Sequence, residues 1–484
     1  MSHRLRRRGR ISAAALTAGA VAGALFLQGA PAYAHGNGHG HGHPGHGHGH
    51  SQSQQVRTTG NLYGTKAVYE PFQDASSYEK APRSYHPVLI EHVGRHGSRL
   101  LSSKKYDDLL WQLWQIADAD GGLTALGEQF GADLQEIIAV HDELGYGILS
   151  TLGEQEQAQI AERAVARMDS LFTRAVRQDK PISIVSSGVD RAAASADSFV
   201  DGLEEADPAL AAVIQPQTVD PALLYFHDTD PEYLEYEDSD QLADVDEALE
   251  AQPAIAAAAR DVASRLFTPE FIARIDAGEF DLVDSGKGKK HLQSVVDVGS
   301  YVYELYVIAP GMSLDATVDM TPYMSDEDAA AFARLSDAED FYKKGPAFAG
   351  SDVTYEMSHV LVDAFLDSVE AAADGDQEYA AEFRFAHAEE IVPLAALLKL
   401  PGSTVQQPAD ELFTYDNNPW RGAQVAPMAA NIQWDVYQGP HGKTIVKMLY
   451  NEQETAFAGT CRPIHRNSYF YSVDELTRCL SDVR

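Results

Sequence analysis

The apolar residues of this chain follow two periods, and the clearest short run lies at 88–93, where Val-Leu-Ile is followed by a further Val. A short run rich in β-branched residues is typical of a buried strand. It stops at Gly94, and polar residues follow at once. Two more strands are expected at 181–185 and 382–386, and a helical pattern follows each of them. Such strand-to-helix junctions are typical of open α/β sheets, in which ligands bind at the carboxyl ends of the strands.

Longer segments repeat their apolar residues with the period of an α-helix. Helices of this kind are expected at 102–117, 154–172, 189–203 and 390–400. Near the carboxyl end, two alternating stretches flank a Gly-Pro turn and predict a β-hairpin at 431–450. Residues 207–370 are mostly helical and acidic, with Pro and Gly breaks, and we expect an inserted helical domain there that covers the site. It would divide the α/β core into the segments 61–206 and 371–484.

The amino terminus carries a different pattern. Five arginines within residues 4–10 precede an apolar run at 11–27, and Ala32-Tyr33-Ala34 offers a cleavage site. This arrangement predicts a secretory signal peptide at 1–34. A retained membrane anchor is the alternative, but the run is short and rich in Ala and Gly, and no later stretch approaches the length of a membrane span. We therefore expect a secreted protein that does not associate with the membrane after cleavage.

Composition and charge narrow the range of partners. The chain has 484 residues, of which 44% are hydrophobic, so it can form a sizeable core. Removal of the signal reduces the 37 basic residues by five to 32, against 72 acidic residues, for a net charge of −40. Such a surface disfavours nucleic acid. It also repels anionic substrates at long range, so a site for a polyanion needs its own patch of positive charge.

The segment after the signal alternates largely between Gly and His from 35 to 50 and contains no apolar residue, so a disordered tail is expected at 35–60. Its histidines are a possible site for zinc, nickel or copper, and the alternative is a solubilising leader with adventitious metal affinity. They are His35, His39, His41, His43, His46, His48 and His50. At the other end of the chain, Cys461 and Cys479 lie close in sequence, and a disulfide between them is expected in an exported protein.

Arginine and histidine cluster directly after the first strand, in the sequence Arg95-His96-Gly97-Ser98-Arg99. Each guanidinium offers a planar fork of donors that can bind a phosphate at two points. Gly97 would allow a ligand to approach the backbone closely. A strand end with solvated arginines would explain any one of these residues alone. The combined pattern favours an oxyanion site, and phosphate is the oxyanion it suits.

Two later junctions carry matching chemistry. Arg191 lies in the first turn of the helix that follows the strand at 181–185, where unpaired backbone N–H groups favour an anion. His387 and Glu389 lie at the third junction and suit a phosphate ligand and a proton donor. Taken alone, Arg191 is equally well an exposed first-turn arginine, and His-Ala-Glu is unremarkable.

The inserted segment holds a run of lysines in a chain that is otherwise short of lysine. Residues 285–291 read Ser-Gly-Lys-Gly-Lys-Lys-His, and this loop is either a solvated surface run or a basic clamp for distal phosphates. Its lysines are Lys287, Lys289 and Lys290. The run 340–345, which contains Lys343 and Lys344, is a weaker second candidate for such a clamp.

The Arg-His-Gly-x-Arg pattern resembles the signature of the histidine phosphatases, in the branch that contains acid phosphatases and phytases. The turn before Arg191 resembles the second phosphate-binding element of that family. Most of its phytases carry His-Asp where this chain has His-Ala-Glu, the form that resembles the multiple inositol polyphosphate phosphatases, as do Asn451-Glu452 and the paired cysteines. The resemblance spans nearly the whole chain after residue 85. Leu101 departs from it, because many relatives carry a proline there.

This resemblance implies an α/β fold with a mostly parallel central sheet flanked by helices and with an inserted, mainly helical domain. It implies that His96 is the nucleophile and becomes phosphorylated, and that Glu389 donates a proton to the leaving alcohol and then activates water. The phosphoryl oxygens would be held by Arg95, Arg99, Arg191 and His387. No cofactor or active-site metal is expected, since the arginine forks take the place of magnesium.

The implied substrates are inositol hexakisphosphate (phytate) and its lower phosphates. A less selective acid phosphatase that acts on sugar phosphates is the nearest alternative. A secreted metal-binding protein, with the histidine tail as its active feature and the phosphatase-like part as a scaffold, is the alternative from another class. The intact set of Arg95, His96, Arg99, His387 and an acid argues against a dead scaffold.

Overall fold

The computed structural model of the protein describes residues 62–286, 288, 290–481 and 483. They belong to one compact unit, Val56–Arg484. The expected signal peptide at 1–34 and the tail at 35–60 lie outside the described residues. Within the described part of the chain, no helix combines the length and the apolar character needed to cross a membrane.

The described residues form a mixed sheet of eight strands, in the order β10-β8-β7-β1-β6-β2-β3, with β9 paired to β8. These strands are β1 (His86–Arg95), β2 (Ile182–Ser186), β3 (Thr218–Val219), β6 (Ala381–Ala386), β7 (Asn431–Gln438), β8 (Thr444–Tyr450), β9 (Gln453–Thr455) and β10 (Phe470–Ser472). The α/β class is confirmed, and the expected hairpin is present as β7 and β8. The prediction of a mostly parallel sheet is corrected to a mixed one: β1, β6, β2 and β3 are parallel, but the hairpin joins the same sheet antiparallel to β1.

Strand β1 lies in the centre of the sheet, between β6 and β7. All of its residues after His86 are buried, which explains why its apolar run is nearly continuous. The buried Glu91 within this run is paired with Arg384 of β6. The strand continues through Gly94, where the sequence predicted its end, so Arg95 is its last residue.

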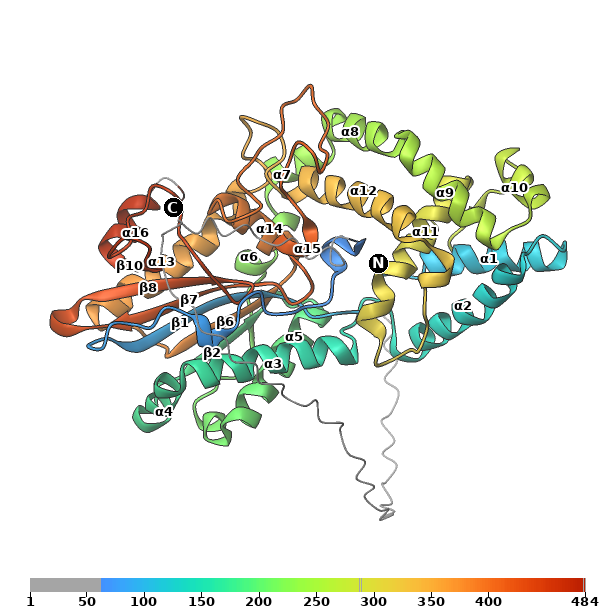
Figure 1. Cartoon of the computed structure of the whole chain (residues 1–484). Helices are drawn as coiled ribbons and strands as arrows, with labels where there is room; N and C mark the ends of the chain where they lie inside the picture. Colours follow the sequence, from blue (N-terminus) through green and yellow to red (C-terminus); the bar gives the residue numbers. More distant parts are fainter. Residues whose placement is uncertain (1–61, 287, 289, 482, 484) are drawn as a thin grey trace, which may run out of the picture. The chain divides into compact units, whose positions relative to one another are not determined.

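Helices cover both faces of the sheet (Figure 1). On one face, Phe199 and Leu203 of α5 join Phe383 and Phe385 of β6 in an apolar cluster that α3 and α4 complete. On the other face, α13, α14 and α16 share a second cluster with β7 and β8. These helices are α3 (Thr151–Arg167), α4 (Asp169–Gln178), α5 (Asp190–Ala206), α13 (His359–Asp374), α14 (Ala388–Leu397) and α16 (Val473–Cys479). The single helix expected at 154–172 is thus two, divided at Met168.

A third apolar cluster brings helices from distant parts of the sequence together. Its main members are α1 (Tyr106–Ala119), α2 (Ala125–Leu144), α9 (Pro253–Leu266), α11 (Val295–Ile308) and α12 (Asp326–Lys344). The helical part therefore draws on residues 106–144 as well as on the expected segment 207–370. The remaining α-helices described are α6 (Pro221–Leu224), α7 (Pro231–Glu237), α8 (Asp240–Glu250), α10 (Pro269–Asp276) and α15 (Gly422–Val425), and β4 (Leu282–Val283) pairs with β5 (His291–Leu292).

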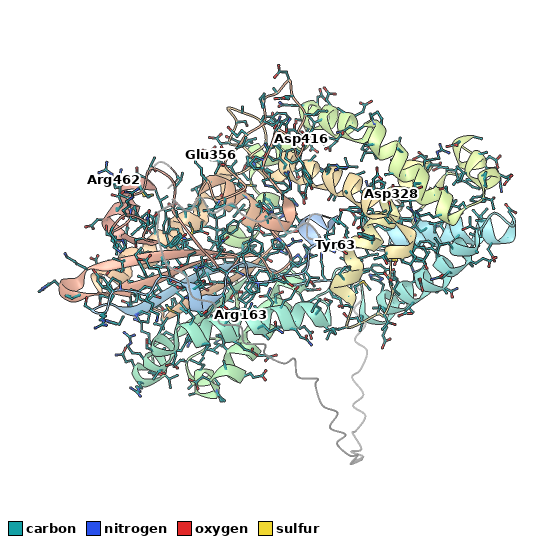
Figure 2. All side chains as sticks on the ribbon, in the orientation of Figure 1. Tyr63, Arg163, Asp328, Glu356, Asp416 and Arg462 are labelled. Carbon is teal, nitrogen blue, oxygen red and sulfur yellow. A yellow bond between two sulfur atoms is a disulfide. The ribbon has the colours of Figure 1, made fainter. Side chains whose placement is uncertain are left out.

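The residues that follow β8 tie the sheet to α3. Glu452 accepts a hydrogen bond from the Tyr69 hydroxyl at 3.0 Å and pairs with Arg163 of α3 at 2.7 Å (Arg163 is labelled in Figure 2). Further along, Cys461 and Cys479 form a disulfide, which confirms the pairing expected from the sequence. It fastens the loop before β10 to the end of α16.

Candidate active site

Three strand ends meet at one edge of the sheet. In the register of the parallel strands, Arg95 of β1 lies beside Ala386 of β6, and Ser186 of β2 lies beside Phe385. The next residues along the chain are therefore brought together, and the rings of His96 and His387 are 5.5 Å apart between centroids. The junctions singled out in the sequence thus form one site, at the edge where open α/β sheets bind ligands.

His96 is buried and has one ring nitrogen engaged by the protein. Its Nδ1 lies 2.9 Å from the carbonyl oxygen of Gly97. Because a carbonyl only accepts, Nδ1 carries the proton and Nε2 keeps its lone pair. Burial, and then the charges of Arg95 and Arg191, hold the pKa of His96 well below its usual value. The imidazole is therefore neutral and nucleophilic at neutral pH.

Arg95 is anchored by the backbone of two other segments. Its Nη1 donates to the carbonyl oxygens of Thr65 and Ala426, while its buried Nε has no partner among the described residues. Burial and the neighbouring Arg99 lower the pKa of Arg95 to about 10, so it stays charged at neutral pH. The backbone anchors fix the guanidinium and leave a donor for a ligand.

Arg99 and Arg191 add two more positive charges to the same place. Arg99 donates from Nη1 to the carbonyl oxygen of Leu100 at 2.8 Å. Arg191 lies in the first turn of α5, and its buried Nε also lacks a partner in the described part of the chain. Burial, followed by the charge of Arg191, lowers the pKa of Arg99. Three arginines that repel one another in this way favour an anion between them.

His387 completes the ring of donors. Its Nε2 lies 2.9 Å from Oγ of Ser187, which also accepts the N–H of Val189 at 3.3 Å. The Ser187 hydroxyl proton can then point to Nε2, which leaves the buried Nδ1–H of His387 without a partner among the described residues. Burial and the charge of Arg191 lower the pKa of His387 to about 3, so the ring is neutral.

Glu389 follows two residues later, at the start of α14, and its carboxylate is paired. Lys344, the last residue of α12, places Nζ 2.8 Å from Oε1 of Glu389 and 3.1 Å from Oδ1 of Asp340. Burial alone would raise the pKa of Glu389, but the charge and hydrogen bond of Lys344 hold it well below its usual value. Lys344 belongs to the run that the sequence offered as a weaker basic clamp, and its pairing with Glu389 was not expected.

Helix α3 supports the signature loop with two residues that the sequence reasoning missed. The Glu156 carboxylate accepts hydrogen bonds from the backbone N–H of Ser98 at 2.6 Å and from that of Tyr69 at 2.9 Å. Gln157 donates from Nε2 to the carbonyl oxygen of Arg95 at 2.9 Å. In the sequence these residues are two of several polar positions on a helix, and nothing marks them.

Gly97 allows a close contact that the sequence did not predict. A Cβ atom at this position would lie 2.4 Å from the carbonyl oxygen of Gly153 in α3. A Cβ atom on Gly153 would in turn lie 2.1 Å from the carbonyl oxygen of Ser98. The two glycines thus let the signature loop and the start of α3 pack backbone against backbone. The close approach is to a helix of the protein.

The lysine loop lies between β4 and β5. Lys287 and Lys289 are outside the described residues, whereas Lys290 is described and exposed. Its charge acts on Lys105, whose pKa is lowered by burial and then by Lys290. Lys66 acts on Lys105 as well, and Glu304 acts on both Lys105 and Arg99. Lys290 is therefore close enough to act on the charge of Lys105, while Lys66 is paired with Glu304 at 3.7 Å.

The donor set of this site suits an anion better than a metal ion. Across the described residues, no group of three or more His, Cys, Asp or Glu side chains is arranged to hold a metal. The seven histidines of the tail lie outside the described residues. The donors without partners at the site are nitrogen atoms that carry protons, and these favour a negatively charged ligand.

A family model described as the histidine phosphatase superfamily (branch 2) matches residues 90–451, a range that includes all three junctions. This chain belongs to that family. It is therefore a histidine-type phosphatase, as the resemblance of its motifs implied. The search of curated proteins found no significant match.

Solved structures support the same assignment. The multiple inositol polyphosphate phosphatase of Bifidobacterium longum in complex with phosphate is 35% identical, with a TM-score of 0.83 over 87% of this chain and 97% of that one. Its complex with inositol hexasulfate gives a TM-score of 0.81 at 35% identity, over 88% and 98% of the two chains. The phytase of D. castellii, with 12% identity and a TM-score of 0.59 over 90% and 89%, shares the fold.

Proposed function

We propose that this chain is an exported phosphomonoesterase that hydrolyses inositol polyphosphates through a phosphohistidine intermediate. One observation carries the proposal: three buried donors surround His96 and have no partner in the described part of the chain. They are Nε of Arg95, Nε of Arg191 and Nδ1 of His387. A buried donor without a partner is costly, so such a set favours a ligand that accepts hydrogen bonds from all of them. A phosphoryl group has three oxygen acceptors and matching negative charge.

In the first half of the reaction, Nε2 of His96 attacks phosphorus. The new N–P bond forms as the bond from phosphorus to the leaving oxygen breaks. Arg95, Arg99 and Arg191 hold the phosphoryl oxygens, and Nδ1–H of His387 donates to one of them. The neutral state of His96 is required here, because a protonated imidazole has no lone pair to offer. The surrounding charges stabilise the transition state without rearrangement.

Glu389 carries the proton in this scheme. An alcohol leaves as a poor alkoxide unless a proton reaches its oxygen as the bond breaks. In the second half, the Glu389 carboxylate accepts a proton from the water that attacks phosphorus, and His96 is released with inorganic phosphate. The proton that Glu389 loses in the first half is thus returned in the second.

The proposed substrate class rests on two supports. The B. longum relatives, at 35% identity, are multiple inositol polyphosphate phosphatases solved with phosphate and with inositol hexasulfate. In this chain, Lys105 lies six residues after Arg99 and is acted on by the charge of Lys290, whereas Lys66 is paired with Glu304 at 3.7 Å; we infer that Lys105 and Lys290 accept further phosphates of a polyphosphorylated ring. A net charge of −40 makes such a local patch necessary for a polyanion to bind.

Export is proposed on the signal pattern at 1–34, and the disulfide between Cys461 and Cys479 agrees with it. Disulfides persist in oxidising compartments and are rare in the cytosol. The mature protein would therefore meet its substrate outside the cell.

Replacement of His96 by Ala tests the proposed chemistry. We expect release of phosphate from phytate to be abolished, while circular dichroism and the unfolding midpoint stay close to those of the parent protein. Acid-quenched parent enzyme should retain labelled phosphate on His96. A variant that keeps more than a few per cent of the activity would refute the nucleophile. Equal kcat/KM values for phytate and for glucose 6-phosphate would favour the less selective phosphatase instead.

A further inference from the structure

The carboxylate of Glu389 is held by a residue from another part of the fold. Lys344 ends α12, and Glu389 lies in the first turn of α14. The Nζ to Oε1 distance of 2.8 Å is that of a charge-assisted hydrogen bond. The side chain of Lys344 is 14% exposed and that of Glu389 is 33% exposed, so the pair is only partly screened by solvent.

Lys344 is itself held from the opposite side. The Asp340 carboxylate, one turn earlier in α12, lies 3.1 Å from Nζ and also accepts a hydrogen bond from the Thr65 hydroxyl at 2.8 Å. Burial opposes the charge of Asp340, but Lys344 and then Lys66 lower its pKa. Lys344 is therefore one ammonium shared by two carboxylates, and both of these carboxylates also act on the charge of Arg95.

Other charged or titratable groups also act on Glu389. His387 and His227 act on it from the start of α14 and from the short helix Phe226–Asp228. The charge of Glu389 is felt by two aromatic hydroxyls, two arginines and a neighbouring acid: Tyr225, Tyr233, Arg95, Arg99 and Glu390. Lys344 has the largest effect of any of these groups on Glu389.

We propose that Lys344 is a positioning residue for Glu389, which it keeps charged and oriented at the edge of the site, and that it thereby sets the upper pH limit for substrates with poor leaving groups. This inference rests on the proposed role of Glu389 as the proton donor. A donor must be protonated when the leaving bond breaks, and an ammonium at 2.8 Å favours the form without a proton. The same ammonium favours the base that activates water in the second half of the reaction. Lys344 thus favours Glu389 as the base of the second half over Glu389 as the proton donor of the first half.

The direction in which replacement of Lys344 should shift the pH profile follows from its ion pair with Glu389. Without the ammonium, Glu389 binds its proton more tightly, so the protonated fraction stays large up to a higher pH. A nearby opposite charge shifts the pKa of a carboxyl by about 1–3 units. Lys344→Met should therefore move the alkaline limb of kcat/KM upward by about one pH unit or more for an alkyl phosphate such as β-glycerophosphate. The limb should hardly move for p-nitrophenyl phosphate, because its leaving group departs without a proton.

Asp340→Asn should move the same limb in the opposite direction. The negative charge of Asp340 opposes the ionisation of Glu389, and it also shares Lys344. Once it is neutral, Lys344 acts on Glu389 alone, and Glu389 loses its proton at a lower pH. Damage to the packing alone would not shift the alkaline limb in opposite directions in Lys344→Met and Asp340→Asn.

The matched control is Lys343→Met. Lys343 is the neighbouring residue of the same helix end, but it is 41% exposed and lies 3.7 Å from Asp246. Its replacement should leave the alkaline limb in place. Lys344→Arg keeps the charge, so its alkaline limb should lie within about half a pH unit of that of the parent enzyme. The titration of the substrate is the same in every variant, so any difference between variants belongs to the protein.

The inference is overturned if Lys344→Met leaves the limb unmoved, or if it and Asp340→Asn shift the limb in the same direction. Should Lys344→Met fail to fold, a missing downward shift in Asp340→Asn overturns it equally. Glu389→Gln separates this inference from the proposed function. A selective loss of alkyl phosphate hydrolysis in Glu389→Gln, together with an unmoved limb in Lys344→Met, refutes the role of Lys344 alone. No loss in Glu389→Gln refutes the proton donor and this inference with it.

Discussion

Glu156 offers a test of how far the chemistry depends on a residue that never touches the substrate. Glu156 is 4% exposed, and its carboxylate accepts three hydrogen bonds, from the backbone N–H of Ser98 at 2.6 Å, the Ser98 hydroxyl at 2.9 Å and the backbone N–H of Tyr69 at 2.9 Å. Ser98 lies between His96 and Arg99 in the chain. We predict that Glu156→Gln lowers activity far more than it lowers stability.

The magnitudes follow from the geometry. Gln keeps one oxygen, which can still accept from Tyr69, but its NH2 group then faces the backbone N–H of Ser98. One hydrogen bond is lost and one buried donor is left unsatisfied, a cost of about 1–3 kcal/mol. Burial raises the pKa of Glu156, so removal of its charge offsets part of that cost. We expect a net loss of about 1 kcal/mol for Gln. For Ala, which leaves all three donors without a partner, we expect about 4 kcal/mol.

The effect on catalysis should be larger, because two facing donors push Ser98 and its neighbours away from α3. A displacement of about 1 Å at reacting groups can reduce the rate by about a hundredfold. For Glu156→Gln we expect kcat/KM for phytate to fall by about 10- to 100-fold. Phosphate release gives the rates, and urea unfolding gives the stability. Glu154→Gln is the control, because Glu154 is exposed on the same helix and should change neither quantity.

The result that would refute this reasoning is a Glu156→Gln enzyme with kcat/KM within twofold of the parent. The loop would then hold its geometry without the helix. A fall in activity that matches the unfolded fraction at the assay temperature would also refute it, since stability alone would explain the loss.

Three further predictions concern the tail, the lysine loop and a buried ion pair. Deletion of residues 35–55 should abolish retention on a metal-chelating column and leave the turnover number for phytate unchanged; a large fall would place the tail in the site. Replacement by Ala of Lys287, Lys289 and Lys290 should raise KM for phytate by about tenfold or more, from exposed contacts that are each worth about 1 kcal/mol or less, and the rise should be larger at low salt than at high salt. Hydrolysis of p-nitrophenyl phosphate should change little, and parallel losses on both substrates would exclude a clamp. His227 lies 2.8 Å from Glu390, and although burial opposes its charge, Glu390 raises the pKa of His227. Burial raises the pKa of Glu390 to about 7, so the two groups titrate as a pair that holds a shared proton at low pH. The contribution of this pair to stability is fully present below about pH 6.5, the unfolded-state pKa of His, and is lost as the pH rises through the folded-state value. Urea unfolding of His227→Gln should show a loss of about 1–3 kcal/mol at pH 5.5 that shrinks by pH 8.5, with the exposed His359→Gln as control.

The three junctions could be predicted from the sequence because each combines a local signal with a rule of topology. A buried strand needs an apolar run, as at 88–93 and 382–386, and such runs are visible in one dimension. Parallel strands then bring their carboxyl ends to one edge, so the sequence alone is enough to expect Arg95, His96 and His387 together. The place of the C-terminal hairpin in the sheet could not be predicted in this way, because nothing in its own sequence says which strand it will join.

The support of the site could not be predicted, because it depends on pairs that only the tertiary fold brings together. Glu156 and Glu154 are both acids near the start of α3, yet one is buried beneath the signature loop and the other faces solvent. The helical period places them on different faces, but it does not say what the buried face meets. The same holds for Gly97, whose partner Gly153 lies in a helix that starts 52 residues after Arg99.

The pairing of Lys344 with Glu389 shows what the His-Ala-Glu motif alone does not reveal about the mechanism. The His-Ala-Glu sequence places an acid at the start of α14, where a proton donor is useful, but it does not state whether that acid holds a proton. That depends on α12, which delivers an ammonium to within 2.8 Å. A lysine run in an acidic chain suggests a clamp for substrate phosphates, and Lys344 would serve that purpose if it faced the ligand alone. Since its charge is already shared by Asp340 and Glu389, Lys344 acts on the acid that moves the proton, and in our proposal the pH dependence of the site is set by a residue outside the three strand-to-helix junctions.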